Sequence, residues 1–307
     1  MIVVCGEALM DVFVGGNTAT GVTLDARIGG SPFNVAIGLA RLRQPVAFFG
    51  GVSSGVLGER LMKALADEGV DTRCTQRLRA PTTLGLVALD DSGVADYAFY
   101  GEGAADRLLP LGALAHVPAL QALHVGSYAM VVEPTATTLR ALVEREHARS
   151  VVAYDPNVRL NVEPAIAHWR AVLQWAVRRC SLLKISDEDL QRLHPQADGD
   201  ALAAQWLAAG VALVVVTRGP AGCTAYGAAG RIDLPAPQVA VIDTVGAGDT
   251  FQAALLTWLA ERDALSGRAI AALDGAQLAD ALNFAARAAA ITCSRRGADL
   301  PRRSELN

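Results

Sequence analysis

Residues 243–250 combine small residues with an acidic side chain directly before an apolar, helix-forming run. Gly246, Ala247 and Gly248 let the backbone turn tightly and present consecutive N–H groups. The helix that follows adds the positive end of its dipole, so the segment is suited to bind an anion, above all phosphate. The carboxylate of Asp249 would repel a resting phosphate, but it could accept a proton from a hydroxyl that attacks phosphorus.

The same segment also has a purely structural interpretation. Aspartate is among the best N-cap residues, and glycine-rich turns often precede helices. Asp249 would then bond to backbone N–H groups of its own helix and take no part in chemistry. The choice depends on whether other polar residues converge on this segment.

Composition argues against several classes of function. The net charge is −4 and Lys and Arg form no runs, so we expect no nucleic-acid partner. The two lysines, Lys63 and Lys184, do not follow a glycine, so the chain has no Walker-type phosphate loop. Five scattered cysteines without a C-x-x-C pair are typical of free thiols in a reducing cytosol, and five histidines lack metal-binding spacing. With no signal peptide and no apolar run near ~20 residues, we expect a cytoplasmic protein without membrane contact.

Short apolar runs alternate with helical patterns along the chain, which predicts an α/β fold with a mostly parallel sheet covered on both faces. Strands are predicted at residues 2–5, 47–49, 123–125, 151–154, 182–185 and 213–217. Helices are predicted at residues 32–43, 57–68, 134–149, 165–178, 187–193, 201–209, 250–260 and 276–292.

Two regions break this alternation. Residues 12–14 and 22–28 have strand character with no helix between them, and residues 84–89 and 95–100 are joined by a turn at 90–93 that ends in glycine. Together they predict a small antiparallel sheet that is inserted at two places and serves as a lid. The alternative is a hairpin that decorates the edge of the main sheet.

Polar residues follow four of the predicted strands. They are Ser127 and Glu133, then Asp155, Asn157 and Arg159, then Ser186 and Asp189, then Thr217, Gly219 and Gly222. Each group alone is explained by a turn, a helix cap or a bend. Ligands of open α/β sheets bind at the carboxyl ends of the strands. Because all four groups of residues lie at these strand ends, on one edge of the sheet, together they favour a binding site.

A second glycine-rich helix entry spans residues 29–34. Gly29 and Gly30 would allow a ligand to approach the backbone closely. Asn34 can both donate and accept hydrogen bonds, as recognition of sugar hydroxyls requires. Asp11 follows the first strand and could accept two hydrogen bonds from a polyol. The structural alternative for the two glycines is a hinge between the lid strand and the helix. The structural alternative for Asp11 is a turn residue.

At this point the chain resembles the ribokinase-like (PfkB) family of carbohydrate kinases. Residues 29–34 (GGSPFN) look like the family's N-terminal signature, and residues 243–249 (DTVGAGD) look like its C-terminal signature. The order and spacing fit, and the resemblance covers the whole chain. Residues 154–159 and 184–189, with Gly126 and Ser127, are similar to the fructokinase branch.

The resemblance implies a three-layer α/β/α sandwich with a small antiparallel β lid. Residues 1–11, 30–80 and 104–307 would form the α/β domain, and residues 12–29 and 81–103 the lid. Asp249 would be the catalytic base, and Gly246, Ala247 and Gly248 the anion hole. The implied sugar-binding residues are Asp11, Gly29, Gly30, Asn34 and Glu133, with Arg159 in contact with phosphate or substrate. The implied ATP-binding residues are Thr217, Gly219, Gly222 and Asn283.

Two cation sites are implied as well. Many members carry an Asn-x-x-Glu motif that orders Mg²⁺ through water, and here Ser186 and Asp189 occupy the matching positions. Asp243 and Val245 belong to a loop that binds a monovalent cation such as K⁺ in some members, with help from residues 294–298. Relatives are often dimers through the lid, so a homodimer is an expectation too.

The function implied is ATP-dependent phosphorylation of a small sugar, most simply of D-fructose at its terminal hydroxymethyl group. Asp249, with an ordinary pKa near ~4, would suffice as a late acceptor of the proton. Other substrates are possible for the same chemistry, namely 2-keto-3-deoxygluconate, ribose or a nucleoside. The acid 2-keto-3-deoxygluconate would be favoured if Arg159 faced the pocket.

Two other classes of protein are disfavoured. A non-catalytic sugar-binding protein would not need Asp249. A NAD-dependent dehydrogenase is disfavoured because no G-x-G-x-x-G follows the first strand.

Overall fold

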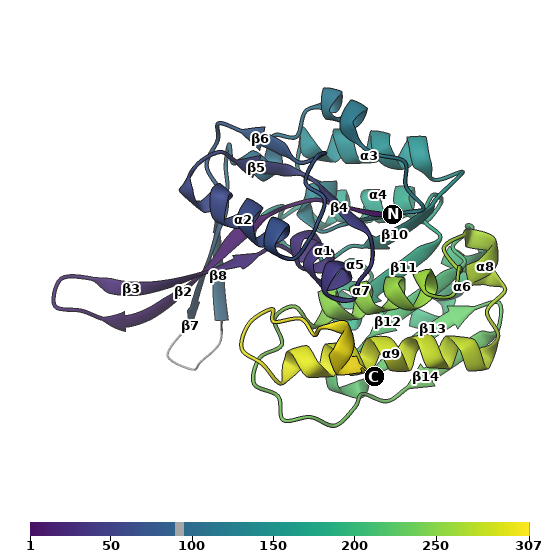
Figure 1. Ribbon diagram of the computed structural model, residues 1–307. Coiled ribbons are helices and arrows are strands. Elements are labelled where there is room, and N and C mark those ends of the chain that lie inside the picture. Colours follow the sequence, from purple (N-terminus) through teal and green to yellow (C-terminus); the bar gives the residue numbers. More distant parts are fainter. Residues whose placement is uncertain (90–94, 307) are drawn as a thin grey trace.

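The computed structural model describes residues 1–89 and 95–306 and has three layers, with one sheet between two groups of helices (Figure 1). The central sheet is eight-stranded, in the order β14-β13-β12-β11-β10-β9-β1-β4. Its strands are β1 (Ile2–Cys5), β4 (Val46–Phe49), β9 (Ala122–Gly126), β10 (Val151–Asp155), β11 (Leu182–Ser186), β12 (Leu213–Thr217), β13 (Cys223–Gly227) and β14 (Gly230–Leu234). Every neighbouring pair from β12 to β4 is parallel, and only the β12–β13 and β13–β14 pairs are antiparallel.

Successive residues of the buried strands face opposite layers. In β1, Ile2 and Val4 pack with one group of helices, and Val3 and Cys5 pack with the other. The first group is α1 (Ser31–Arg41), α2 (Val56–Asp67), α7 (Ala247–Ala260), α8 (Gly267–Ala271) and α9 (Gly275–Cys293). The second group is α3 (Thr135–Glu146), α4 (Ile166–Ala176), α5 (Asp187–Leu193) and α6 (Gly199–Ala208). Burial on both faces explains why these strands are apolar without alternation.

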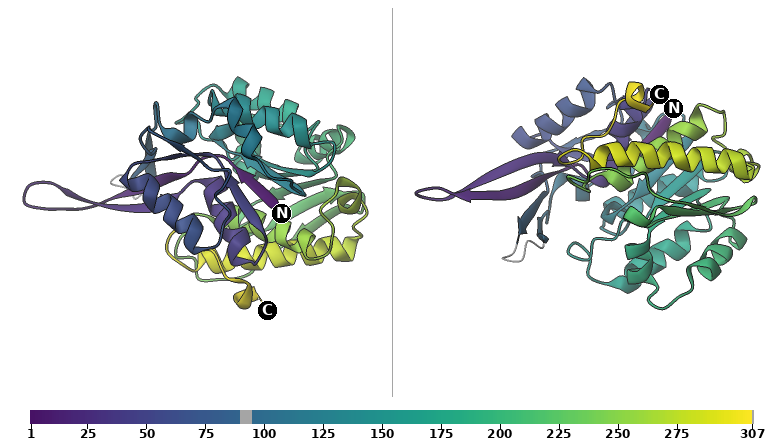
Figure 2. Two further views of the ribbon diagram at one scale, coloured as in Figure 1. Left: turned by 45° about the horizontal axis from the view of Figure 1, so that its top comes forward. Right: turned by 90° about the horizontal axis from the view of Figure 1, so that it is seen from below.

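The lid strands form a separate sheet, with a long hairpin that projects from one end of the molecule (Figure 2). Its order is β3-β2-β7-β8, from β2 (Leu9–Asn17), β3 (Val22–Gly29), β7 (Leu84–Leu89) and β8 (Ala95–Tyr100). The expected sheet is present, but it is mixed rather than antiparallel, because β2 and β7 pair in parallel. The β2 strand begins at Leu9 and therefore includes Asp11, which the sequence analysis placed outside the lid. The predicted turn at 90–93 lies outside the described residues.

Several elements were not predicted. They are the β13–β14 edge hairpin, helix α8, and a two-stranded sheet of β5 (Gly51–Ser53) and β6 (Gln76–Leu78). Short 3₁₀ helices complete the chain, at Ala105–Arg107, Leu111–His116, Tyr128–Met130, Gly219–Ala221 and Arg303–Leu306. Within the described residues, no helix has the length and apolar character required to cross a membrane.

Candidate active site

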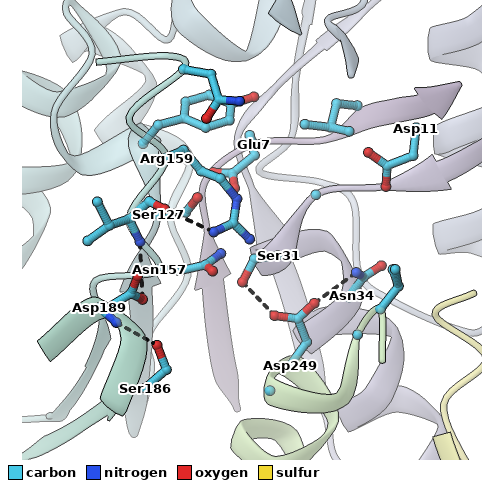
Figure 3. A pocket seen from close by; sticks show the side chains of 18 of the residues that line it. Glu7, Asp11, Ser31, Asn34, Ser127, Asn157, Arg159, Ser186, Asp189 and Asp249 are labelled. Atoms are coloured by element: carbon cyan, nitrogen blue, oxygen red, sulfur yellow. Dashed lines mark hydrogen bonds between the residues drawn. The ribbon is translucent and has the colours of Figure 1, made fainter. Parts of the chain in front are cut away.

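Asp249 lies in the first turn of α7, where two side chains from α1 hold its carboxylate (Figure 3). The Ser31 hydroxyl donates to Asp249 Oδ1 at 2.6 Å, and the Asn34 amide donates to Oδ2 at 2.8 Å. The N-cap of α7 is Gly246, so the N-cap interpretation of Asp249 is wrong. A cap would bond to its own helix, whereas Asp249 bonds to residues more than 200 positions away.

The surroundings of Asp249 make it a stronger base than the sequence analysis assumed. Burial raises the pKa of Asp249 above the ordinary aspartate value. The hydrogen bonds from Ser31 and Asn34 act in the opposite direction, as does the charge of Lys184. The pKa of Asp249 is therefore raised, which brings it closer to that of an effective general base.

The backbone of the anion loop requires glycine at position 246. Gly246 has φ 78°, and a Cβ there would lie 2.7 Å from the Cβ of Ala298. Asp243 fixes the loop from outside: its Oδ1 accepts from the backbone N–H of Val245 at 3.0 Å, and its Oδ2 from that of Gly297 at 2.7 Å. The predicted connection between this loop and residues 294–298 is thus present.

Lys184 is a charged residue of the site that the sequence analysis did not assign to it. Its ammonium forms a buried ion pair with Asp155, with 2.7 Å between Nζ and Oδ2. A Cβ added to Gly248 would lie 2.9 Å from Nζ, so the ammonium borders the anion loop. Burial lowers the pKa of Lys184, but Asp155 and the hydrogen bond to it outweigh burial and raise the pKa overall. The sequence feature that could have identified Lys184 as a site residue is its position as a single lysine inside an otherwise apolar strand.

A cavity of about 670 Å³ opens between this loop, the carboxyl ends of the strands and the lid. The predicted residues that line it are Asp11, Gly30, Asn34, Arg159, Ser186, Asp189, Val245, Gly246, Gly248 and Asp249. Phe13, Val87 and Phe99 line it from the lid strands. Gly29 does not line it, but a Cβ there would come within 2.1 Å of Asp11 Oδ2, so this glycine makes room for the carboxylate.

Asp11 faces the cavity from β2. The pKa of Asp11 is raised to about 6, mainly by burial. The charge of Arg159 lowers this pKa and the charge of Asp249 raises it, and both effects are included in that value. Arg159 lies across the cavity in Figure 3 and donates through Nη1 to the Val158 carbonyl at 3.1 Å. The cavity therefore presents a carboxyl group that accepts hydrogen bonds and a guanidinium group that donates them. The hydroxyls of a polyhydroxy compound can bond to both.

The residues expected to order Mg²⁺ lie together at the start of α5. Ser186 is the N-cap and its hydroxyl accepts from the Asp189 N–H at 3.1 Å. Asp189 Oδ2 accepts from the Val158 N–H at 3.2 Å, and Oδ1 forms an ion pair with Arg192 at 3.1 Å. Nearby, Asp155 Oδ1 is buried without a hydrogen-bond partner among the described residues. The donor set is oxygen-rich, which is the ligand chemistry that Mg²⁺ prefers, and the Asp155 oxygen would be available to a water of its hydration shell.

Other predicted residues lie outside the cavity. Glu133 is about half exposed; it pairs with Arg140 and accepts from the Thr137 N–H at 2.9 Å, so its expected contact with the sugar is not supported. Pro134, which follows Glu133, is the N-cap of α3. Thr217 ends β12, Gly219 and Gly222 follow it, and exposed Asn283 on α9 donates to the Ala279 carbonyl at 2.9 Å. None of these four expected ATP ligands lines the cavity.

Residues that the sequence analysis did not assign to the site also line the cavity. Ser31 lay within the glycine-rich signature, and Ser127 and Asn157 were noted only as polar residues after strands. Glu7 directly follows Gly6 after the first strand, a position that the sequence analysis used only to argue against a dinucleotide motif. Ser31 is the first residue of α1, and Glu7, Ser127 and Asn157 are isolated residues outside the strands and α-helices, so apolar periodicity carries no signal for the direction of these side chains.

Comparisons with known proteins agree with this geometry. The pattern of the pfkB family of carbohydrate kinases matches residues 1–305. A fructokinase of Rhizobium leguminosarum bv. trifolii is 38% identical over 279 residues, which cover 89% of this chain and 84% of the relative.

Two solved structures extend the likeness to the fold. A fructokinase with bound ATP from Xylella fastidiosa has a TM-score of 0.89 and 27% identity, and the match covers 99% of this chain and 96% of the other. A fructokinase from Vibrio cholerae O395, in a form with bound fructose, ADP and calcium ion, has a TM-score of 0.83 and 27% identity and covers 99% and 97%. With its Asp249 and anion loop at a polar cavity, this chain belongs to the pfkB family of carbohydrate kinases.

Proposed function

We propose that this protein is an ATP-dependent fructokinase, which transfers the γ-phosphoryl group of ATP to the terminal hydroxymethyl group of D-fructose. The observation that carries the proposal is the position of Asp249, which faces both the anion loop and a cavity lined by Asp11, Asn34 and Arg159. The similarity to fructokinases supports the choice of sugar. One of these relatives, from Vibrio cholerae O395, holds fructose and ADP in its solved structure.

In the proposed mechanism, Asp249 accepts the proton of the sugar hydroxyl as its oxygen bonds to phosphorus. The bond between the γ-phosphorus and the bridging oxygen of ADP breaks, and the electron pair leaves with ADP. The N–H groups of Gly246, Ala247 and Gly248 bind the oxygens of the transferred group, and the ammonium of Lys184 adds a fixed positive charge beside them. Asp11, Gly30, Asn34 and Arg159 hold the sugar.

The remaining cofactor assignments belong to the same proposal. Thr217, Gly219, Gly222 and Asn283 would bind ATP beyond the end of the cavity. Ser186 and Asp189 would hold the water shell of Mg²⁺, which when bound neutralises phosphate charge. Asp243 and Val245 would take part in a K⁺ site, which a fructokinase structure with potassium supports. All five cysteines are free, which suits a cytosolic protein.

We also propose a homodimer through the lid sheet. One face of this sheet carries Asp11 and Phe13 toward the cavity. The opposite face pairs Val14 with Leu24 across the hairpin, and both side chains are exposed, as is Val22. An apolar face on a projecting sheet with an open edge strand is typical of an interaction surface.

The substrate is tested by measuring ADP release with fructose, 2-keto-3-deoxygluconate, ribose and a nucleoside, each with ATP and Mg²⁺. We expect the highest kcat/KM with fructose. The acid 2-keto-3-deoxygluconate is the second candidate, because Arg159 lines the cavity. No turnover of fructose, together with turnover of the acid sugar, would overturn the first proposal in favour of the second.

The catalytic role is tested with Asp249→Asn, which keeps the shape, lets its oxygen accept from Asn34 and its NH2 group donate to the Ser31 hydroxyl, and removes the base. We expect kcat to fall roughly 10²–10⁴-fold while the variant still binds ATP and sugar. Asp274→Asn, at the exposed N-cap of α9, is the matched control and should keep kcat. A near wild-type kcat for Asp249→Asn would remove Asp249 from this role.

A further inference from the structure

Glu7 is a buried carboxyl group of the cavity that the mechanism above does not use. It directly follows Gly6, after the end of β1, and its side chain is 1% exposed while it lines the cavity. Its Oε2 atom is buried without a hydrogen-bond partner among the described residues. Buried polar atoms in folded proteins are nearly always paired, so this oxygen needs an explanation.

The neighbours of Glu7 place it at the end of the cavity that Arg159 occupies. Figure 3 shows the Glu7 carboxyl beside the Arg159 guanidinium, with Ser127 on the other side and Asp249 farther away. Its backbone lies against Gly30, where an added Cβ would meet the Glu7 carbonyl oxygen at 2.7 Å. Glu7 is thus packed between the end of β1 and the glycine-rich start of α1.

Burial raises the pKa of Glu7 to about 8, and the hydrogen bond with the Ser127 side chain acts in the opposite direction. The charged or titratable groups around it are Asp106, which raises this pKa, Arg159, which lowers it, and the Tyr128 hydroxyl. Near neutral pH the carboxyl is therefore mainly protonated. A neutral carboxyl can donate one hydrogen bond and accept others, which suits a sugar hydroxyl.

A second buried carboxyl nearby shows what a structural role would look like. Asp106 is also 1% exposed, but it does not line the cavity. Its Oδ1 accepts from the Thr83 hydroxyl at 2.6 Å and its Oδ2 from the Tyr128 hydroxyl at 2.8 Å. Both oxygens of Asp106 are therefore paired within the protein, whereas Glu7 keeps one oxygen for a ligand.

We propose that Glu7 is a sugar-binding residue whose free carboxyl oxygen exchanges a hydrogen bond with a non-reacting hydroxyl of the sugar at the Arg159 end of the cavity. This inference rests on the proposed function, since it assumes that a sugar occupies the cavity. Asp249 then marks the hydroxyl that reacts, and Glu7 contributes to selecting which sugar presents it.

The test compares Glu7→Leu and Glu7→Gln with the wild-type enzyme and with Asp106→Asn as the matched buried-carboxyl control. For Glu7→Leu we expect the KM for the sugar to rise at least tenfold, with kcat, the KM for ATP and Tm changed little. Glu7→Gln keeps a donor and an acceptor and should restore much of the affinity. Asp106→Asn should lower Tm and leave the KM for the sugar unchanged.

Two further measurements separate binding from support of the fold. The KM for the sugar in the wild type should change as pH rises through about 8, and in Glu7→Gln this change should be absent. Among monodeoxy analogues of the sugar, the one that lacks the contacted hydroxyl should bind the wild type and Glu7→Leu equally well. If every analogue loses the same factor in the variant, Glu7 does not contact the sugar.

Failure of the proposed function is recognised separately. The wild type is first assayed on the sugar panel, and the sugar it phosphorylates best is used for every variant. If the wild type turns over no sugar, the proposed function is wrong. If the wild type turns over its sugar and Glu7→Leu keeps the wild-type KM, the assignment of Glu7 alone is overturned.

Discussion

The carboxyl groups of the cavity differ in function because their surroundings differ. Asp249 is held by two donors from α1, Asp11 accepts no hydrogen bond from the part of the chain that the structure describes, and Glu7 lies in a nearly closed environment. Burial raises the pKa of all three, but to different extents: to about 6 for Asp11 and to about 8 for Glu7. Different pKa values in one cavity separate the roles of otherwise similar groups.

Asp11 should make sugar binding depend on pH on the acidic side. Its raised pKa, about 6, means that it is charged at pH 7 and becomes protonated as pH falls through that value. A protonated carboxyl accepts hydrogen bonds more weakly, so we expect the KM for the sugar to rise roughly tenfold between pH 7 and pH 5. Asp11→Asn should have a high KM that does not vary over this range. A variant that follows the wild-type profile would show that another group titrates.

Lys184 should matter for both stability and catalysis. In Lys184→Met, Asp155 is left buried and uncompensated, which should cost about 3–5 kcal/mol of unfolding free energy. The double variant Lys184→Met/Asp155→Asn should recover much of this stability, because no uncompensated charge remains. We expect it to keep a kcat at least tenfold below wild type, since the charge beside Gly248 is still missing. Urea unfolding and steady-state rates measure the two effects, and recovery of both would leave Lys184 with a structural role only.

At the scale of elements, the start of α7 shows what an apolar pattern cannot detect. The apolar run predicted a helix from residue 250, but α7 begins at Ala247 because Gly246 adopts a left-handed conformation as its N-cap. The first turn consists of loop residues that belong to the anion site and carry no apolar periodicity. The parallel strands were predicted well because their buried runs are predominantly apolar and are separated by helical patterns.

The features that were not predicted have different physical causes. The parallel pairing of β2 with β7 joins segments about 70 residues apart, and no local pattern specifies its direction. The β13–β14 hairpin has mixed polarity because it is the edge of the sheet. Glu133 was expected to contact the sugar, yet its side chain pairs with Arg140 and does not line the cavity.

Two glycines of the α7 start should respond differently to alanine. Gly246→Ala places a side chain at φ 78° and against Ala298, so we expect a loss of about 1–3 kcal/mol in unfolding free energy and a lower kcat. Gly248→Ala has no such strain in φ, but its Cβ would lie 2.9 Å from the buried Lys184 ammonium, so we expect a smaller loss of stability than for Gly246→Ala, together with a lower kcat. Gly69→Ala, with φ 79° and open space, measures the cost of the conformation alone. Equal stability of all three variants would contradict this assignment.

At the scale of the whole molecule, the site exists only because separate segments meet. The cavity is lined from β2, α1, the loops after β9 and β10, the start of α5 and the start of α7. The sequence allowed the main residues to be predicted because the two glycine-rich segments and the polar strand ends share one sheet edge. It could not predict that Ser31 and Asn34 both bond to Asp249, since that depends on how α1 packs against α7.

The lid sheet gives a prediction for assembly of the whole molecule. Leu24 is 57% exposed on the edge strand β3, next to Val14 and on the face opposite the cavity. Burial of this apolar face by a second copy would explain its exposure in one chain, so we expect sedimentation to show a dimer for the wild type. Leu24→Lys would place a charge in that interface and should shift the protein toward monomer with little change in Tm. Leu111→Lys, equally apolar and 54% exposed on the 3₁₀ helix Leu111–His116, is the control and should remain a dimer. A wild type that is monomeric at all concentrations would exclude the lid as a dimer interface.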